Sequence, residues 1–313
     1  MTSSPPPPAA PSRRAFRHRF EGPELRRVLF EFVRRVPPAA QRAAVPPATS
    51  VFYAAIPEAR HAIDANLTVV LGGAGAIERH RRAFGLFVNY AQTIVYLYSL
   101  HAGGAMPVDL RFVALENFER SFHDGNGVIT ITAHLGAWQL MPYLLHSRAH
   151  MPPVTMAMAE EPNRRLSEFE QKLRAKFNII YTTGSPFVLL ELQKVLRRGE
   201  VVGMQFDRQV GAGHASVPFF GRPATFPLGA VMLARLSGCP IVPVFAVYPG
   251  GDRSRVEVHY EAPIQVAHTR DRAADVGDAL ARTTAVYERW VRRYPLQWFN
   301  FYDFWAPATT TVS

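Results

Sequence analysis

Apolar positions between Pro23 and Val36 recur at steps of three and four, which predicts a helix with one apolar face. Arginines flank this stripe, Pro23 suits the first turn of a helix, and Pro37 and Pro38 end it. An apolar stripe with arginine margins fits two situations equally well. The helix lies either in a membrane interface or on the surface of its own domain.

The longest stretch without a formal charge runs from Ala83 to Val108 and is long enough to cross a bilayer. Polar side chains and a Gly103-Gly104 pair interrupt it, and unpaired polar groups are costly in hydrocarbon. We therefore predict a buried helix from about Ala83 to Leu100 in preference to a membrane span.

Downstream of Val128 the pattern changes to short β-rich runs that alternate with helical stretches. This alternation is typical of a mostly parallel sheet covered by helices, so we predict an α/β fold with an amino-terminal helical segment. The expected strands are 128–132, 154–159, 179–181, 201–206 and 241–248. The expected helices are 138–146, 163–176, 186–198 and one that opens at Pro227 and is capped by Gly238.

Proline and arginine dominate the first residues, so residues 1–22 are expected to form a disordered arm. We expect residues 23–305 to form a single domain, with a helical part over 23–110 and an α/β core over 111–305. Residues 306–313 are then a short tail.

Composition limits the possible partners. The chain has 313 residues, and 35 Lys and Arg against 25 Asp and Glu give a formal net charge of +10. That charge favours an anionic membrane surface or an acidic carrier protein. Nucleic-acid binding is not expected, because neither zinc-ligand spacing nor an RNP-type aromatic pattern is present. No metal site is expected, and Cys239, the single cysteine, is interpreted as a small buried side chain.

Several polar residues directly follow predicted strands, where the ligand crevice of an open parallel sheet lies. They are His134, Glu160, Arg164, Asp207 and Arg208. His134 stands between a strand and the helix expected after it. The positive end of that helix dipole disfavours an imidazolium and keeps a neutral base available, so we predict that His134 is a general base.

The segment His134-Leu135-Gly136-Ala137-Trp138-Gln139 resembles the histidine motif of the bacterial lipid A late acyltransferases. These lauroyl and myristoyl transferases belong to the glycerolipid and lysophospholipid acyltransferase superfamily. The resemblance runs from about Ala59 to Trp305. Its other stretches are Asn66-Leu67, 199–203 leading to Asp207-Arg208, 217–224, 241–245 and 295–299. Separated motifs in the same order are more specific than the histidine motif alone.

The resemblance implies an acyltransferase with a glycerolipid-acyltransferase-like fold. His134 would take a proton from the hydroxyl or amine of a lipid or glycolipid acceptor, which attacks the thioester of an acyl-carrier protein or acyl-coenzyme A. No cofactor beyond that acyl donor is implied. The location implied is the cytoplasmic face of a bacterial inner membrane, as a peripheral or monotopic protein.

The family has Glu or Asp five positions after the histidine, and this chain has Gln139 there. A glutamine carbonyl can accept a hydrogen bond from the imidazole but carries no charge to stabilise the imidazolium. Either another carboxylate has taken the role, or the enzyme is slow, or the chain is an inactive acyl- or lipid-binding homologue. We favour Asp207, with Glu160 as a further candidate. The alternative for Asp207 is an ion pair with Arg164 or Arg208 that only holds strand ends together.

The predicted substrate contacts lie on other segments. Arg164, which resembles the arginine of a second family motif, and Arg208 are predicted to bind phosphate or the polar acceptor, because guanidinium matches oxyanions. For Arg164 a solvated helix end is the alternative. Phe219, Phe220 and Gly221 are predicted to form a wall for the acyl chain, with core packing as the alternative. The aromatic segment 297–305 is predicted to seal the end of the chain against the sheet, with a membrane anchor as the alternative.

Overall fold

The computed structural model describes residues 23–102, 109–122, 126–141, 152–158, 178–182, 187–208, 213–251 and 255–306. Several predictions fall outside these described residues. They are the arm at 1–22, the helix at 163–176, most of the helix at 138–146, and the candidates Glu160 and Arg164.

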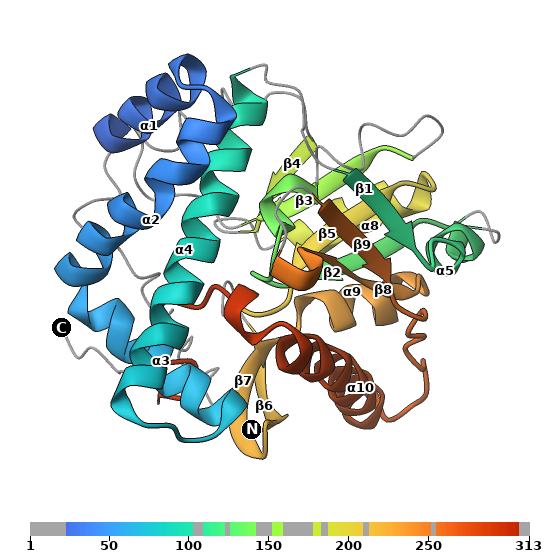
Figure 1. Cartoon of the computed structure of the whole chain (residues 1–313). Helices are drawn as coiled ribbons and strands as arrows, with labels where there is room; N and C mark the ends of the chain where they lie inside the picture. The colour runs from blue at the N-terminus through green and yellow to red at the C-terminus, as the bar shows by residue number, and fades with distance from the viewer. Residues whose placement is uncertain are drawn as a thin grey trace, which may run out of the picture.

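The amino-terminal part is a group of helices beside the sheet (Figure 1). They are α1 (Pro23–Arg35), α2 (Pro38–Ala55), α3 (Pro57–Leu71) and α4 (Ala76–His101). The first three begin at a proline, whose fixed φ suits the first turn of a helix. Helix α4 contains the predicted stretch 83–100 and packs on the sheet through Tyr96, Leu97 and Leu100. None of the helices in the described part of the chain is long and apolar enough to cross a membrane.

Helix α1 is placed on its own domain. It contacts α4, and Val33 on its apolar stripe is buried. Val28 on the same helix is 64% exposed. Docking on its own domain therefore explains the burial of Val33, whereas Val28 of the same stripe remains exposed to solvent.

The centre of the molecule is a sheet in the order β1-β9-β8-β2-β5-β3-β4. Its strands are β1 (Asp109–Val113), β2 (Val128–Thr132), β3 (Val154–Met158), β4 (Asn178–Tyr181), β5 (Val201–Gln205), β8 (Ile241–Val247) and β9 (Arg255–Tyr260). Every neighbouring pair is parallel except β8 and β9. The prediction of a mostly parallel sheet covered by helices is confirmed.

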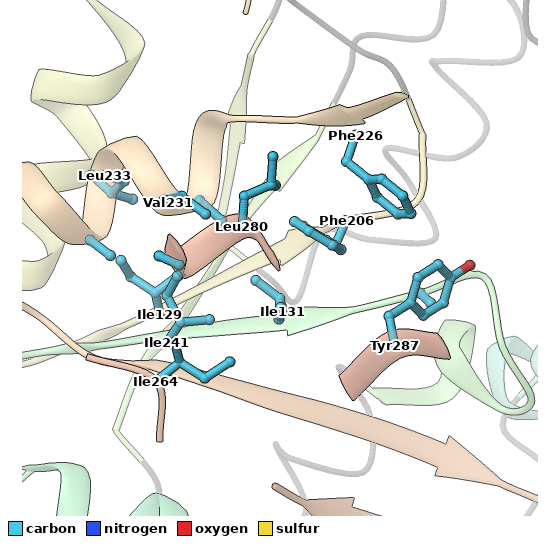
Figure 2. Close-up of a cluster of buried hydrophobic side chains, with 14 of the residues drawn as sticks. Ile129, Ile131, Phe206, Phe226, Val231, Leu233, Ile241, Ile264, Leu280 and Tyr287 are labelled. Atoms are coloured by element: carbon cyan, nitrogen blue, oxygen red, sulfur yellow. The ribbon is translucent and has the colours of Figure 1, made fainter. Parts of the chain in front are cut away.

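Alternate residues of the central strands lie in two separate cores, because successive side chains of a strand point to opposite faces of the sheet. Ile129 and Ile131 of β2 pack with helices α8 (Val188–Arg197), α9 (Gly229–Ser237) and α10 (Arg272–Arg293) on one face (Figure 2). Val128 faces the other core, which contains side chains of α4 and of α5 (Glu116–Glu119). Both faces of β2 and β8 are covered, which explains why β8 is wholly apolar and why the polar residues of β2 are only threonines.

The predicted strands of the sheet are all present to within a residue or two, but other elements were not predicted. Strands β1 and β9 lie at one side of the sheet, and α10 follows β9 after a loop. Strands β6 (His214–Phe219) and β7 (Arg222–Pro227) form a separate antiparallel hairpin. Its two-residue turn, Phe220 and Gly221, has positive φ at both positions, as in the turns that match the twist of a hairpin.

The carboxyl-terminal segment folds back onto the molecule after the 3₁₀ turn η4 (Pro295–Gln297). Trp298, Phe299 and Phe304 are almost completely buried. Phe299 packs among the amino-terminal helices, while Trp298 and Phe304 join the core under α10. The prediction that this segment seals the end of the chain is confirmed.

Candidate active site

The strand order brings His134 and Asp207 to the same edge of the sheet. Strands β2 and β5 are parallel neighbours, and Thr132 at the end of β2 pairs with Gln205 at the end of β5. The chain leaves both strands at this edge, and each side chain lies two residues beyond its strand. The sequence expectation of a polar cluster at the carboxyl ends of the strands is met for these two residues.

Two hydrogen bonds join His134 to Asp207. The imidazole Nδ1 lies 2.7 Å from Oδ1 of Asp207, and the backbone N–H of His134 donates to Oδ2 at 2.9 Å. Both residues are buried, with 3% and 2% of their surface exposed. Because a carboxylate can only accept, Nδ1 carries the proton and Nε2 keeps its lone pair.

The backbone after His134 makes a sharp turn against the sheet. Gly136 has φ of 59°, and its N–H donates to the carbonyl of Gln297 at 2.8 Å. A Cβ at this position would collide with the carbonyl oxygen of Ala246 on β8. The glycine of the motif is therefore required by backbone geometry and by the close approach of β8.

Carboxyl-terminal residues hold this turn from its other side. The N–H of Phe299 donates to the carbonyl of His134 at 2.7 Å. The amide of Gln297 both donates to the carbonyl of Tyr248 at 2.8 Å and accepts from its N–H at 3.0 Å. Gln297 at the end of η4 and Phe299 after it thus hold the main chain that carries the imidazole.

The electrostatics favour a neutral imidazole beside a carboxylate near neutral pH. Burial lowers the pKa of His134 below its ordinary value of 6.5, the charge of Arg208 lowers it further, and Asp207 opposes both. For Asp207, burial alone favours the protonated form. The charge and hydrogen bonds of His134 and the charge of Arg208 outweigh burial and bring the pKa of Asp207 to about 2.

Most of the helix expected at 138–146 lies outside the described residues, so the helix dipole invoked from the sequence stays a prediction. After His134 the chain forms the 3₁₀ turn η2 (Trp138–Leu140), and Met141, which follows it, is helical. Among the described residues, burial and the charge of Arg208 lower the pKa of His134.

Gln139 does not replace the family carboxylate as the partner of the imidazole. Its Oε1 is buried and has no hydrogen-bond partner among the described residues, while Asp207 occupies Nδ1 of His134. The ring centroid of the neighbouring Trp138 lies 4.4 Å from that of the imidazole, and its buried Nε1 also has no partner in the described part of the chain. Asp207 is thus a carboxylate in contact with the imidazole, while Glu160 lies outside the described residues.

Arg208 contributes charge at the site without forming an ion pair with Asp207 in the described part of the chain. Its Nε is buried and has no hydrogen-bond partner there, and its charge is felt at both His134 and Asp207. The alternative of an Asp207–Arg208 pair that only joins strand ends does not describe this geometry. Arg164 lies outside the described residues.

Residues 26–306, most of the chain, match the bacterial lipid A biosynthesis acyltransferase family. The chain belongs to this family. It is therefore an acyltransferase. A solved structure is also similar, the 1-acyl-sn-glycerophosphate acyltransferase PlsC from Thermotoga maritima, at 14% sequence identity and a TM-score of 0.34, covering 79% of this chain and 97% of that one. No curated protein sequence matches the chain significantly.

Phe219, which was predicted to line the acyl chain, packs in the core of the protein. Phe219 is completely buried at the end of β6, where its ring stacks on Tyr287 at 5.2 Å. Phe220 and Gly221 form the hairpin turn, and the N–H of Phe220 donates to Glu288 at 2.7 Å. The structure favours the core-packing alternative for Phe219, and Phe220 covers part of the same core.

Sequence reasoning missed two residues of the site, Tyr287 on α10 and Asn300 after η4. The Tyr287 hydroxyl donates to Oδ2 of Asp207 at 3.0 Å, and Nδ2 of Asn300 lies 3.3 Å from the same oxygen. The match at 295–299 pointed near Asn300, but Tyr287 lies on a helix that was not predicted. Among the described residues, no group of three or more His, Cys, Asp or Glu side chains could hold a metal ion.

Proposed function

We propose that this acyltransferase moves a fatty acyl group from a thioester donor, acyl-carrier protein or acyl-coenzyme A, to a hydroxyl or amine of a lipid or glycolipid acceptor. Nε2 of His134 takes the proton from the acceptor as its oxygen or nitrogen attacks the thioester carbon. The new C–O or C–N bond forms and the C–S bond breaks. The thiolate leaves with the proton that His134 returns, so no cofactor or external reductant is needed.

The observation that carries this proposal is the buried contact of 2.7 Å between Nδ1 of His134 and Asp207. It supports a base whose tautomer is fixed and whose imidazolium, once formed, lies beside a negative charge. The inactive lipid-binding alternative rested on Gln139 as the missing carboxylate. With Asp207 in contact with the imidazole, that substitution no longer argues against catalysis.

Arg208 fits a second role in the same step. A guanidinium whose Nε has no partner among the described residues offers charge and a donor to the oxyanion that develops on the thioester carbonyl or to a phosphate of either substrate. Its charge also keeps His134 neutral before the reaction. Removing it by Arg208→Met should lower transfer and raise the pKa of His134, which the pH dependence of kcat/KM reports.

The substitution that tests the base is His134→Ala, which should abolish transfer while donor binding persists, because the base acts on the acceptor proton. His259→Ala is the matched control, since His259 is a partly buried histidine paired with a carboxylate, Glu257, at 3.1 Å in β9. Transfer is measured from acyl-carrier protein and acyl-coenzyme A donors to total lipid extract. Full transfer by His134→Ala would remove the base from the mechanism.

We also propose that the protein acts as a peripheral or monotopic protein on the anionic, cytoplasmic face of an inner membrane. The net charge of +10 and the exposed Val28 on α1 support this. Arg34 and Arg35 both contact the single carboxylate of Glu31, which offsets one of their two positive charges.

Sedimentation with phosphatidylglycerol vesicles tests this attachment. The protein should bind, and should bind less at high salt, because screening weakens the electrostatic part. Val28→Asp should reduce binding more than Val51→Asp, which changes a valine of similar exposure, 67%, on α2. Equal binding to neutral vesicles, or no loss with Val28→Asp, would remove α1 from the contact.

A further inference from the structure

The carboxylate of Asp207 is held by residues from the carboxyl-terminal part of the chain. Among the described residues, its Oδ1 is hydrogen-bonded by His134 alone, at 2.7 Å. Its Oδ2 is shared by the N–H of His134 at 2.9 Å, the hydroxyl of Tyr287 at 3.0 Å and the side-chain amide of Asn300 at 3.3 Å. The two oxygens of one carboxylate therefore have different surroundings.

We propose that Tyr287 and Asn300 are positioning residues, which act through Asp207 to set the orientation and the basicity of His134. This inference rests on the proposed function, in which His134 is the base. The donors that hold Asp207 beside the base lie on α10 and after η4, and not at the position occupied by Gln139.

Tyr287 is built to be a fixed donor. Burial first, and the negative charge of Asp207 second, raise the pKa of Tyr287 well above its ordinary value, so the hydroxyl keeps its proton. The ring is held by a stack on Phe219 and by edge contacts with Phe206 and Phe226. Figure 2 shows Tyr287 at the border of the apolar cluster, with its hydroxyl directed away from the aliphatic side chains.

The hydrogen bonds to Oδ2 also fix the direction of Oδ1. A carboxylate that accepts several hydrogen bonds on one oxygen cannot rotate without breaking them, so the other oxygen stays directed at Nδ1. The same donors disperse the negative charge of Asp207 and limit how far it raises the pKa of His134. Tyr287 and Asn300 thus keep the imidazole oriented and still neutral near pH 7.

Asn300 is held in turn by the amino-terminal helices. Nδ2 of Asn66, on α3, donates to the backbone carbonyl of Asn300 at 3.1 Å and to that of Tyr302 at 2.8 Å. Oδ1 of Asn66 accepts from the N–H of Phe304 at 2.9 Å. The buried Asn66 therefore fixes the main chain that carries the second donor to Asp207.

The test is Tyr287→Phe, which removes the hydroxyl and keeps the stacked ring. We expect kcat to fall on the order of tenfold, the loss typical of one hydrogen bond to a charged group, with both KM values unchanged. Without this donor the charge on Asp207 is less dispersed and raises the pKa of His134. The acidic limb of the kcat/KM profile should therefore move to higher pH, as should the His134 titration followed by NMR.

Two further variants make the outcome specific. Tyr302→Phe also removes a hydroxyl bound to Asp207, at 3.1 Å, but that hydroxyl bonds the backbone carbonyl, so the acidic limb should stay in place. Asn300→Leu, which keeps the side-chain volume, should move the limb in the same direction as Tyr287→Phe. If Tyr287→Phe does not fold, the pH profile of Asn300→Leu tests the positioning role.

The results separate this inference from the proposed function. If His134→Ala retains transfer, the general base itself is wrong, whatever Tyr287→Phe does. If His134→Ala abolishes transfer and Tyr287→Phe and Asn300→Leu keep the wild-type pH profile and the wild-type His134 titration, the positioning role is overturned. A loss of stability with an unchanged acidic limb would likewise make Tyr287 a packing residue only.

Discussion

Two sets of polar atoms surround His134, and they differ in how completely they are paired. On one side, the carboxylate of Asp207 accepts four hydrogen bonds from described residues. On the other, Nε1 of Trp138, Oε1 of Gln139 and Nε of Arg208 are buried without any partner in the described part of the chain.

Buried polar atoms without partners are costly, and native proteins keep few of them. Those near His134 lie on the segment that directly follows it and on the residue after Asp207. Described residues alone therefore fix the orientation of the His134 imidazole, whereas the atoms of Trp138, Gln139 and Arg208 have no partner among those residues.

The largest effect is expected from Asp207→Asn. The amide cannot stabilise an imidazolium and can favour the wrong tautomer, so kcat should fall on the order of 10² or more. Asp275→Asn is the control, because Asp275 is a buried carboxylate paired with Arg235 at 3.0 Å away from His134. It should cost stability and leave kcat near wild type. Wild-type kcat in Asp207→Asn would reassign Asp207 to structure.

Gly136→Ala should disturb the turn that carries His134. The added Cβ meets the Ala246 carbonyl and the φ is unfavourable, so we expect a loss of about 1–3 kcal/mol in the free energy of unfolding, together with reduced kcat. Gly127→Ala, at the start of β2, also forces a backbone contact, with Glu200, but lies at the other end of the strand. It should destabilise the protein with a smaller effect on kcat, as urea unfolding and transfer assays can show.

Acidification should lower the free energy of unfolding through the protonation of His134 and Asp207. The pKa of His134 is lowered in the folded state, so unfolding gains a proton as pH falls below about 6.5, and stability decreases. The pKa of Asp207 is lowered from 3.8 to about 2 in the folded state. The free energy of unfolding therefore falls by a further ~2 kcal/mol as pH drops through that interval. The free energy of unfolding of wild type and of His134→Asn is measured at pH 7 and at pH 5. From pH 7 to pH 5, wild type should lose more of this free energy than His134→Asn does. A constant difference would contradict the lowered pKa of His134.

The smallest effect is expected from Gln139→Glu. Because Asp207 already contacts Nδ1 of His134, a carboxylate at 139 should change kcat by less than about threefold. In the Asp207→Asn background the same substitution should raise kcat more, because the imidazole then lacks a charged partner. The two substitutions form a double-mutant cycle, and strict additivity would show that position 139 does not act on the base.

Much of the fold followed from local patterns. Strands β2, β5 and β8 were predicted because they read as short runs rich in apolar and β-branched residues, each of which follows a glycine or a proline within two positions. The hairpin β6–β7 was not predicted, and prolines and a two-residue turn interrupt the pattern of its strands. Helix α10 was not predicted at all. Its many arginines are at the surface, and the face that it buries includes polar side chains such as Thr283.

The sequence by itself determined that His134, Asp207 and Arg208 each follow a strand, because the end of a strand is a local feature. Only the tertiary structure decided that the first two touch. They are 73 residues apart, and β5 lies beside β2 although β3 and β4 come between them in the chain. Strand order depends on long-range packing, which local propensity does not encode. The same holds for Tyr287 and Asn300, which reach Asp207 because α10 and the end of the chain pack against the carboxyl ends of β2 and β5.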